Sequence, residues 1–177
     1  MLPSAIQTGT IRLGAMRLSS LADYAVVMMS ATARHCGGVA RLNATRLAED
    51  TGLPLPTVQK LVSRLSAAGL VETGRGAAGG FRLARPAAAI SLADIVEAVE
   101  GPIALTTCVD ADRHDCAVEG SCRVRPHWGG VNALVRNALA SVSLATISCS
   151  YAVGGKPAER TLSQLDPALR PGAGVHA

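Results

Sequence analysis

The first part of the chain carries apolar residues at helical spacing in three successive segments. The first helix is predicted between Ser19, which has the side chain of an N-cap, and the pair Gly37-Gly38. A second, short helix is predicted over residues 44–50, because Asn43 can cap its start and Gly52 can end it.

A third helix is predicted to begin at Pro54–Pro56 and to stop at Gly69. Its inward-facing apolar positions are Val58, Leu61, Val62 and Leu65. A strand over 70–73, a glycine-rich turn over 74–80 and a return strand over 81–83 follow. Helix, turn, helix and hairpin in this order predict a winged helix-turn-helix, a mainly α fold with a small β-hairpin, whose third helix enters the major groove of DNA.

The second part of the chain predicts two further helices. Ser91 and Asp94 have the spacing of a capping box for a helix through residue 100, which Gly101-Pro102 closes. After Pro126 one amphipathic helix of about five turns is predicted. Its apolar positions are Val131, Leu134, Val135, Ala138, Leu139, Val142 and Ala145. A long helix of this kind needs a partner surface, so we expect it to pack against its counterpart in a homodimer; packing back on its own domain is the alternative.

These predictions divide the chain into five parts. The first is expected to be a loose extension, because it has few periodic apolar positions, and Met16 is a candidate start of the protein. The parts are the extension (1–15), the winged helix-turn-helix domain (16–100), a cysteine-rich cluster-binding loop (101–126), the dimerisation helix (127–150) and a tail predicted to be disordered (151–177).

The positive charge of the chain is localised. Between positions 41 and 85 seven basic residues stand against three acidic ones, so this segment carries the whole net charge of +4. A localised excess is typical of a phosphate-binding face. The predicted contacts to double-stranded DNA are Thr57, Gln59, Lys60, Ser63, Arg64, Arg75 and Arg82. Glutamine suits adenine and lysine or arginine suits guanine, whereas hydroxyls and later basic residues hold phosphates. A solvated helix face is the alternative.

Composition excludes several classes of protein. The longest apolar runs are far too short to span a bilayer, so no membrane partner is expected. Five cysteines, an odd number, and no secretion signal pattern favour the reducing cytoplasm. No nucleophile elbow, phosphate loop or dinucleotide fingerprint is present, which predicts a protein that is not an enzyme and has no small-molecule substrate. Cys36 and Cys149 are expected to be small buried hydrophobes.

Three cysteines lie in one short polar stretch: Cys108, Cys116 and Cys122, followed by His127. Seven, five and four residues separate these four positions, so the close pairs that are common in structural zinc sites are missing. An iron-sulfur cluster accepts three thiolates from one open loop, with a fourth ligand of another kind from elsewhere. The pattern therefore favours a cluster, while zinc and redox-reactive or incidental thiols stay open.

Four stretches share the pattern of a known family. They are Met-Arg-Leu-Ser-Ser-Leu-Ala-Asp-Tyr-Ala-Val from Met16, Gly-Leu-x-x-x-x-Val-Gln-Lys-Leu-Val-Ser-Arg-Leu over 52–65, Arg-Gly-Ala-Ala-Gly-Gly-Phe-Arg-Leu over 75–83, and the three-cysteine loop. The chain resembles iron-sulfur-sensing winged-helix regulators of the IscR and NsrR type, and is most similar to regulators of the SUF cluster-assembly operon. The resemblance covers residues 16–147. It implies a dimeric repressor or dual regulator of cluster-assembly genes that binds a cluster, with [2Fe–2S] favoured over [4Fe–4S].

The resemblance also bears on the fourth ligand. The assembly regulators use a histidine three residues after the third cysteine, but this chain has Arg125 there, which cannot bind iron. The nitric-oxide-sensing branch uses an acidic residue on the first helix, at the position of Asp23. We favour Asp23 of the partner subunit over His127. The alternative function is a redox- or nitric-oxide-responsive transcription factor that uses its thiols directly, without a cluster.

Overall fold

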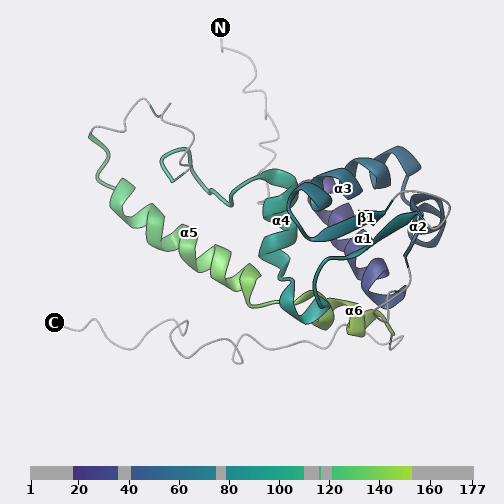
Figure 1. Ribbon diagram of the computed structural model, residues 1–177. Coiled ribbons are helices and arrows are strands. Elements are labelled where there is room, and N and C mark those ends of the chain that lie inside the picture. The colour runs from purple at the N-terminus through teal and green to yellow at the C-terminus, as the bar shows by residue number, and fades with distance from the viewer. Residues whose placement is uncertain (1–17, 36–40, 75–78, 110–115, 117–120, 153–177) are drawn as a thin grey trace, which may run out of the picture.

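The computed structural model describes residues 18–35, 41–74, 79–109, 116 and 121–152 (Figure 1). Its elements are α1 (Ser20–His35), α2 (Ala44–Thr51), α3 (Leu55–Ala67), β1 (Val71–Gly74), β2 (Gly80–Leu83), the 3-10 turn η1 (Ala87–Ala89), α4 (Leu92–Glu100), α5 (Arg125–Ala140) and α6 (Leu144–Ala152). The predicted extension over 1–15 and nearly all of the predicted tail lie outside these residues. Within them, no helix has the length and apolarity needed to cross a membrane.

Several helix ends lie where local chemistry predicts them. The Asn43 side chain accepts a hydrogen bond from the Arg46 backbone N–H at 2.6 Å, and Gly52 ends α2 with a φ of 70°, in the left-handed region. Ser91 and Asp94 cap the start of α4 reciprocally, each side chain accepting from the other residue's backbone N–H. The predicted caps of α2 and α4 are therefore confirmed.

The wing is an antiparallel hairpin in which Val71 lies opposite Leu83. The segment before α2 also pairs with it, because Leu42 and Phe81 exchange backbone hydrogen bonds of 2.9 and 2.8 Å. Phe81 is almost completely buried, so the hairpin is attached both to the core and to the start of the helix-turn-helix.

The core forms around α1, which contacts α2, α3, α4 and α6 (Figure 1). The fully buried large apolar side chains of this core are Met28, Met29, Leu47, Val58, Leu61, Leu65, Leu70, Ile90, Ile95 and Leu144. We call the unit made by α1 to α4, the hairpin and α6 the winged body. The observed helices and hairpin confirm the predicted winged-helix fold.

The single long helix predicted after Pro126 is two helices, separated by a turn over 141–143. Two backbone hydrogen bonds attach this region to the winged body: Leu92 N to Val142 O and Leu144 N to Ile90 O, each 2.8 Å. Leu144 is fully buried, and α6 packs on α1, which is the arrangement named above as the alternative for this region. The break arises from these tertiary contacts, because apolar spacing continues through it in the sequence.

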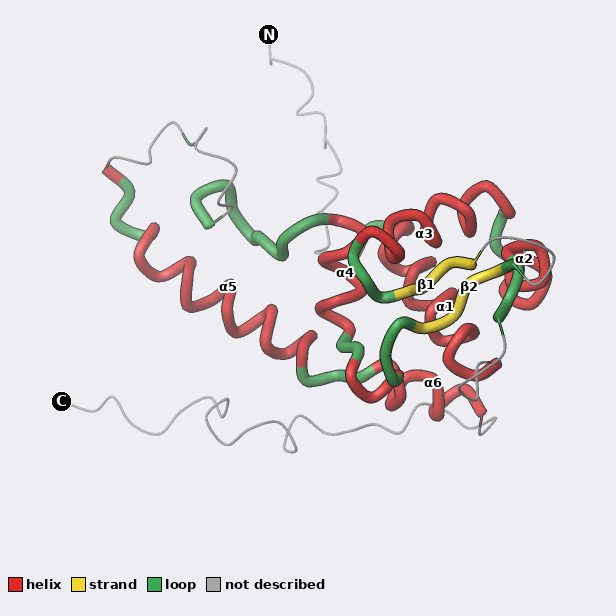
Figure 2. The backbone as a smooth tube through the Cα atoms, viewed as in Figure 1, coloured by secondary structure: helices red, strands yellow, loops and turns green. Residues whose placement is uncertain are grey.

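The other half of that predicted helix, α5, projects from the winged body (Figure 2). None of its residues is fully buried. The described parts of the cysteine loop leave the end of α4 and return at the far end of α5, so loop and helix form one projecting unit. We call α5 together with residues 101–124 the arm.

Candidate DNA-binding surface and cysteine loop

The recognition helix α3 presents the polar face that the sequence predicts. Its buried residues are Val58, Leu61 and Leu65. The exposed polar residues are Gln59, Lys60, Ser63 and Arg64, with Thr57 half-buried in the first turn. The structure therefore gathers these five candidate DNA contacts on one helix.

Arg64 has a second contact that the sequence could not reveal. Its Nη1 donates a hydrogen bond to the carbonyl oxygen of Val99, in the last turn of α4. A cation is favourable there, because the last turn of a helix carries partial negative charge. A guanidinium has five N–H donors, so this bond leaves others for a phosphate. Arg64 therefore connects the recognition helix to α4 and stays a candidate DNA contact.

On the wing, Arg82 is paired with the residue opposite it in the hairpin. Its Nη2 and Nε lie 2.8 and 2.9 Å from Oε2 of Glu72. Both side chains are more than 40% exposed, which makes the pair a weak one that a phosphate can compete with. The other predicted wing contact, Arg75, lies outside the described residues.

Sequence reasoning missed a further basic residue, Arg41, which is exposed beside the turn end of the hairpin. Its Nη1 donates to the Gly80 carbonyl at 3.4 Å, and a Cβ on Gly74 would lie only 2.3 Å from the same atom. Gly74 therefore makes room for this side chain, whereas a Cβ on Gly80 would lie 2.5 Å from the Leu42 carbonyl oxygen. The glycines at the two ends of the predicted turn were the available signal.

The three loop cysteines are free thiols, and each is half-buried. Cys108 Sγ lies 3.2 Å from the hydroxyl of Thr106. In the described part of the chain, no group of three or more Cys, His, Asp or Glu side chains lies close enough together to hold a metal ion. The residues between the cysteines, 110–115 and 117–120, are outside that part. By its chemistry, three free thiols on one loop, the donor set fits an iron-sulfur cluster.

The two candidate fourth ligands lie apart, one where the arm leaves the winged body and one at the far end of the arm. Asp23 is exposed in the first turn of α1, where the Ser19 hydroxyl donates to the Glu100 carboxylate at the end of α4. His127 is exposed in the first turn of α5, far out on the arm (Figure 1). The prediction that Cys149 is buried is wrong, because this residue lies exposed on the outer side of α6. Cys36, the other cysteine outside the loop, lies outside the described residues.

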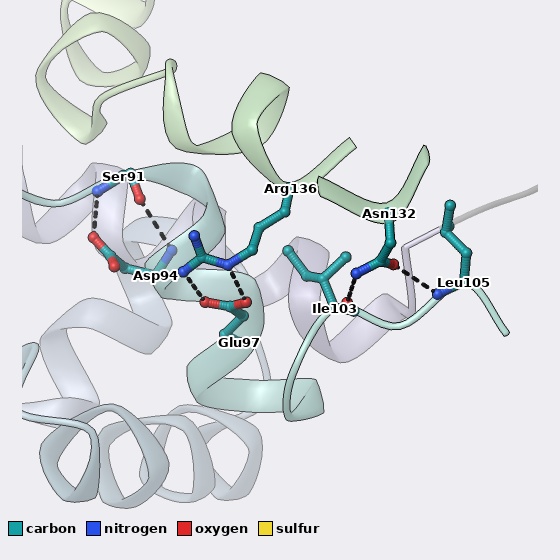
Figure 3. A network of polar contacts seen from close by, with 7 residues as sticks. All are labelled: Ser91, Asp94, Glu97, Ile103, Leu105, Asn132 and Arg136. Carbon is teal, nitrogen blue, oxygen red and sulfur yellow. Dashed lines mark hydrogen bonds and ion pairs between the residues drawn. The ribbon is translucent and has the colours of Figure 1, made fainter. Parts of the chain in front are cut away.

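The arm is joined to the winged body by polar contacts (Figure 3). Arg136 of α5 donates from Nε and Nη2 to the two carboxylate oxygens of Glu97 on α4, at 2.8 and 2.9 Å. The hydrogen bond to Glu97, together with its negative charge, raises the pKa of Arg136 above the usual arginine value. One turn earlier, the Asn132 carboxamide donates to the Ile103 carbonyl at 2.8 Å and accepts from the Leu105 N–H at 3.0 Å.

Another side of α5 exposes apolar residues. Val131 is 41% exposed and Leu134 is 53% exposed, three residues apart on the helix. Residues with this spacing share a helix face. The arm therefore presents an apolar surface next to the polar contacts that hold it.

The sequence that folds into this arrangement matches a known protein family. The family model described as Iron-dependent Transcriptional regulator (Rrf2) matches residues 18–150. The protein aau3 of Rhizobium meliloti is 37% identical over 124 residues, which cover 70% of this chain and 75% of that protein.

Two solved structures share the fold. CymR, the global cysteine regulator of B. subtilis, is 27% identical with a TM-score of 0.58, covering 76% of this chain and 97% of that one. IscR of T. potens is 28% identical with the same TM-score, covering 80% and 94%. These likenesses confirm the predicted resemblance and the prediction of a protein that is not an enzyme. The chain thus belongs to the Rrf2 family of DNA-binding transcriptional regulators.

Proposed function

We propose that this regulator is a homodimeric repressor of iron-sulfur cluster assembly genes that senses cluster status through a cluster of its own. The observation that carries the proposal is the position of three free, half-buried thiols, Cys108, Cys116 and Cys122, between the DNA-reading winged body and the projecting helix α5. A group bound there orders the segment that links the two parts. A [2Fe–2S] cluster is favoured over [4Fe–4S].

Operator DNA is held by the exposed face of α3 and by the wing. Gln59, in the first turns of α3, reads base edges, while Thr57, Lys60, Ser63 and Arg64 hold phosphates and fix the register. Arg75 and Arg82 of the wing reach the neighbouring backbone and minor groove. To this set we add Arg41, because its guanidinium lies beside Gly74 and Gly80 at the turn end of the hairpin.

The second copy of the chain packs on the apolar side of α5, around Val131 and Leu134. These side chains are large, apolar and exposed, and no residue of α5 is fully buried. Two such helices, related by a two-fold axis, remove each other's apolar surface from water.

Dimerisation also bears on which subunit supplies the fourth ligand. In one chain Asp23 lies on α1 in the winged body, whereas Cys122 lies at the far end of the arm (Figure 1). A carboxylate that completes the cluster therefore comes from the partner subunit, and His127 is the alternative within the same chain. A ligand from the partner makes cluster binding depend on dimer geometry.

The switch is a change of population between two dimer arrangements. When bound, the cluster supplies an inorganic centre whose presence depends on iron, sulfide and oxidants. The chain supplies the rest: ordering the loop around three thiolates costs conformational entropy, which the bonds to the ligands offset. A useful switch needs a coupling of about 1–3 kcal/mol between the cluster and the operator.

The test is iron and sulfide analysis with absorption spectra of protein purified without oxygen. Wild-type protein and Cys149→Ala, which removes an exposed cysteine outside the loop, are expected to carry iron and sulfide in equal amounts. Cys116→Ala is expected to lose both. Loss in Asp23→Ala identifies the carboxylate ligand, and retention there with loss in His127→Ala identifies the histidine. A wild-type protein that remains free of iron and sulfide after reconstitution contradicts the proposal.

A second function rests on the same three free thiols, which can react without a cluster. In that case the loop thiols respond directly to oxidants or nitric oxide. Colourless wild-type protein whose operator affinity changes on reversible thiol oxidation, and does not change in Cys116→Ala, favours this function.

A further inference from the structure

Both ends of the cysteine loop are attached to the same helix. Leu105, three residues before Cys108, is bonded to Asn132 in the middle of α5. Arg125, three residues after Cys122, is the first residue of α5. Positions 125 and 132 are seven residues apart, which is about 10 Å along a helix. The Asn132 contact therefore closes a loop that contains all three cysteines.

The asparagine side chain suits this closure. It is half-buried, and it uses its N–H donor on the Ile103 carbonyl and its oxygen on the Leu105 N–H. Asparagine carries both a donor and an acceptor in one flat group, whereas aspartate has no donor and alanine has neither. The two bonds fix the backbone of 103–105 against α5 before the loop turns toward Cys108.

The closure continues into the winged body through the same face of α5 (Figure 3). Arg136 lies four residues after Asn132, so the two side chains are neighbours on the helix surface. Arg136 holds Glu97 of α4, and two residues later in α4 the Val99 carbonyl accepts from Arg64 of the recognition helix. The cysteine loop and α3 are therefore connected by side-chain hydrogen bonds of described residues, which α5 and α4 join along their lengths.

We propose that Asn132 is a positioning residue that closes the cysteine loop on α5 and couples the state of the loop to the DNA-reading helix through Arg136 and Glu97. Closing a loop in advance lowers the entropy lost when its thiols gather around a ligand. The coupling part rests on the proposed function, since a cluster is the ligand named there. The closure itself does not.

The first experiment tests closure in the cluster-free protein by amide hydrogen exchange. Asn132→Ala is compared with Asn137→Ala, which makes the same change at an exposed position of the same helix. Exchange of the Leu105 amide is expected to quicken about tenfold or more in Asn132→Ala, because its acceptor is removed, and to stay unchanged in Asn137→Ala. Asn132→Asp keeps the acceptor and is expected to fall between them. Equal exchange in both alanine variants overturns the closure.

The second experiment measures the ratio of operator affinities with and without the cluster. Coupled sites usually differ 5- to 150-fold, and this ratio is expected to fall toward one in Asn132→Ala while Asn137→Ala keeps the wild-type value. An unchanged ratio in Asn132→Ala overturns the coupling.

If the wild-type protein takes up no cluster, the proposed function fails, but the coupling between the loop and α3 can still be tested. Coupling is reciprocal, so operator DNA must then change the exchange of the Leu105 amide. This change is expected in the wild type and in Asn137→Ala and is expected to be lost in Asn132→Ala. Identical Leu105 exchange in free and operator-bound wild type overturns the coupling without involving a cluster.

Discussion

The winged body and the arm are stabilised in different ways. In the described chain, every fully buried apolar side chain belongs to the winged body, whereas α5 contributes none. The arm is joined to the body by the ion pair of Arg136 with Glu97, and within the arm Asn132 fastens residues 103–105 to α5. Burial of apolar surface is the main favourable term in folding, so the body has its own source of stability. The arm depends on what binds it, as a regulatory element must if a ligand or a second copy is to change its position.

The largest effect on the free energy of unfolding is expected when a buried side chain of the winged body is shortened. Leu61→Ala, in the centre of the body, is expected to lower the free energy of unfolding by about 2–5 kcal/mol, because it removes a fully buried side chain. Urea denaturation followed by circular dichroism measures this loss. Leu134→Ala, on the arm, is the control and is expected to cost less than about 1 kcal/mol in dilute monomer. Equal losses at both positions would show that the arm has a core of its own.

A charge on the apolar side of the arm tests its dependence on a second copy. Leu134→Asp is expected to weaken the dimer about 100-fold, because the carboxylate would be buried at the interface, while the body keeps its melting temperature as a monomer. Light scattering over a dilution series measures the dissociation. Ala133→Asp, an exposed neighbour on a different side of α5, is expected to remain dimeric. If both variants remain dimeric, the interface does not include Leu134.

Within the body, DNA binding and stability are expected to depend on different residues of α3. Lys60→Ala is expected to reduce the slope of log affinity against log salt by about one, because one phosphate contact is lost. Unfolding is expected to change little, since the side chain is exposed. Gln59→Ala is the control: it should reduce discrimination between operators and leave the slope unchanged. A slope unaffected by Lys60→Ala would remove this residue from the phosphate contacts.

The smallest effect concerns the exposed ion pair of the wing. Glu72→Gln is expected to change the free energy of unfolding by less than about 1 kcal/mol, because Arg82 and Glu72 are both largely exposed. Operator affinity should rise, since Arg82 no longer pairs with a carboxylate. Glu49→Gln on α2 makes the same change in net charge, and fluorescence anisotropy should show a smaller gain for it. Equal gains would mean that only the total charge matters.

The sequence predicted those parts of the fold that neighbouring residues determine. Asn43 and Gly52 delimit α2 through a cap and a left-handed backbone, and Ser91 with Asp94 begins α4. These features act within a few residues, so the chain reveals them directly. The polar face of α3 followed from the same short-range periodicity.

Distant contacts could not be predicted in this way. The break between α5 and α6 depends on Ile90 and Leu92, some fifty residues earlier, and its local signal is only Ser143, whose hydroxyl accepts from the Thr146 N–H at 3.2 Å. The partner of Arg64 is a backbone carbonyl 35 residues away. For the candidate site, the sequence identified the thiols, but the closure by Asn132 depends on a helix packing beside a loop. The sequence therefore identified the thiols, but it could not predict the contacts that connect the cysteine loop to α5 and to the winged body.

The return of the chain from α5 to the winged body limits how this regulator can be cut or shortened. Leu144 comes after the arm in the sequence, yet it fills part of the core beside α1. Truncation of the chain at the turn over 141–143 would remove α6 with Leu144, so it would leave a cavity and uncover apolar surface instead of releasing a permanently active DNA reader. Only an internal deletion that keeps α6 would remove the arm and preserve the core.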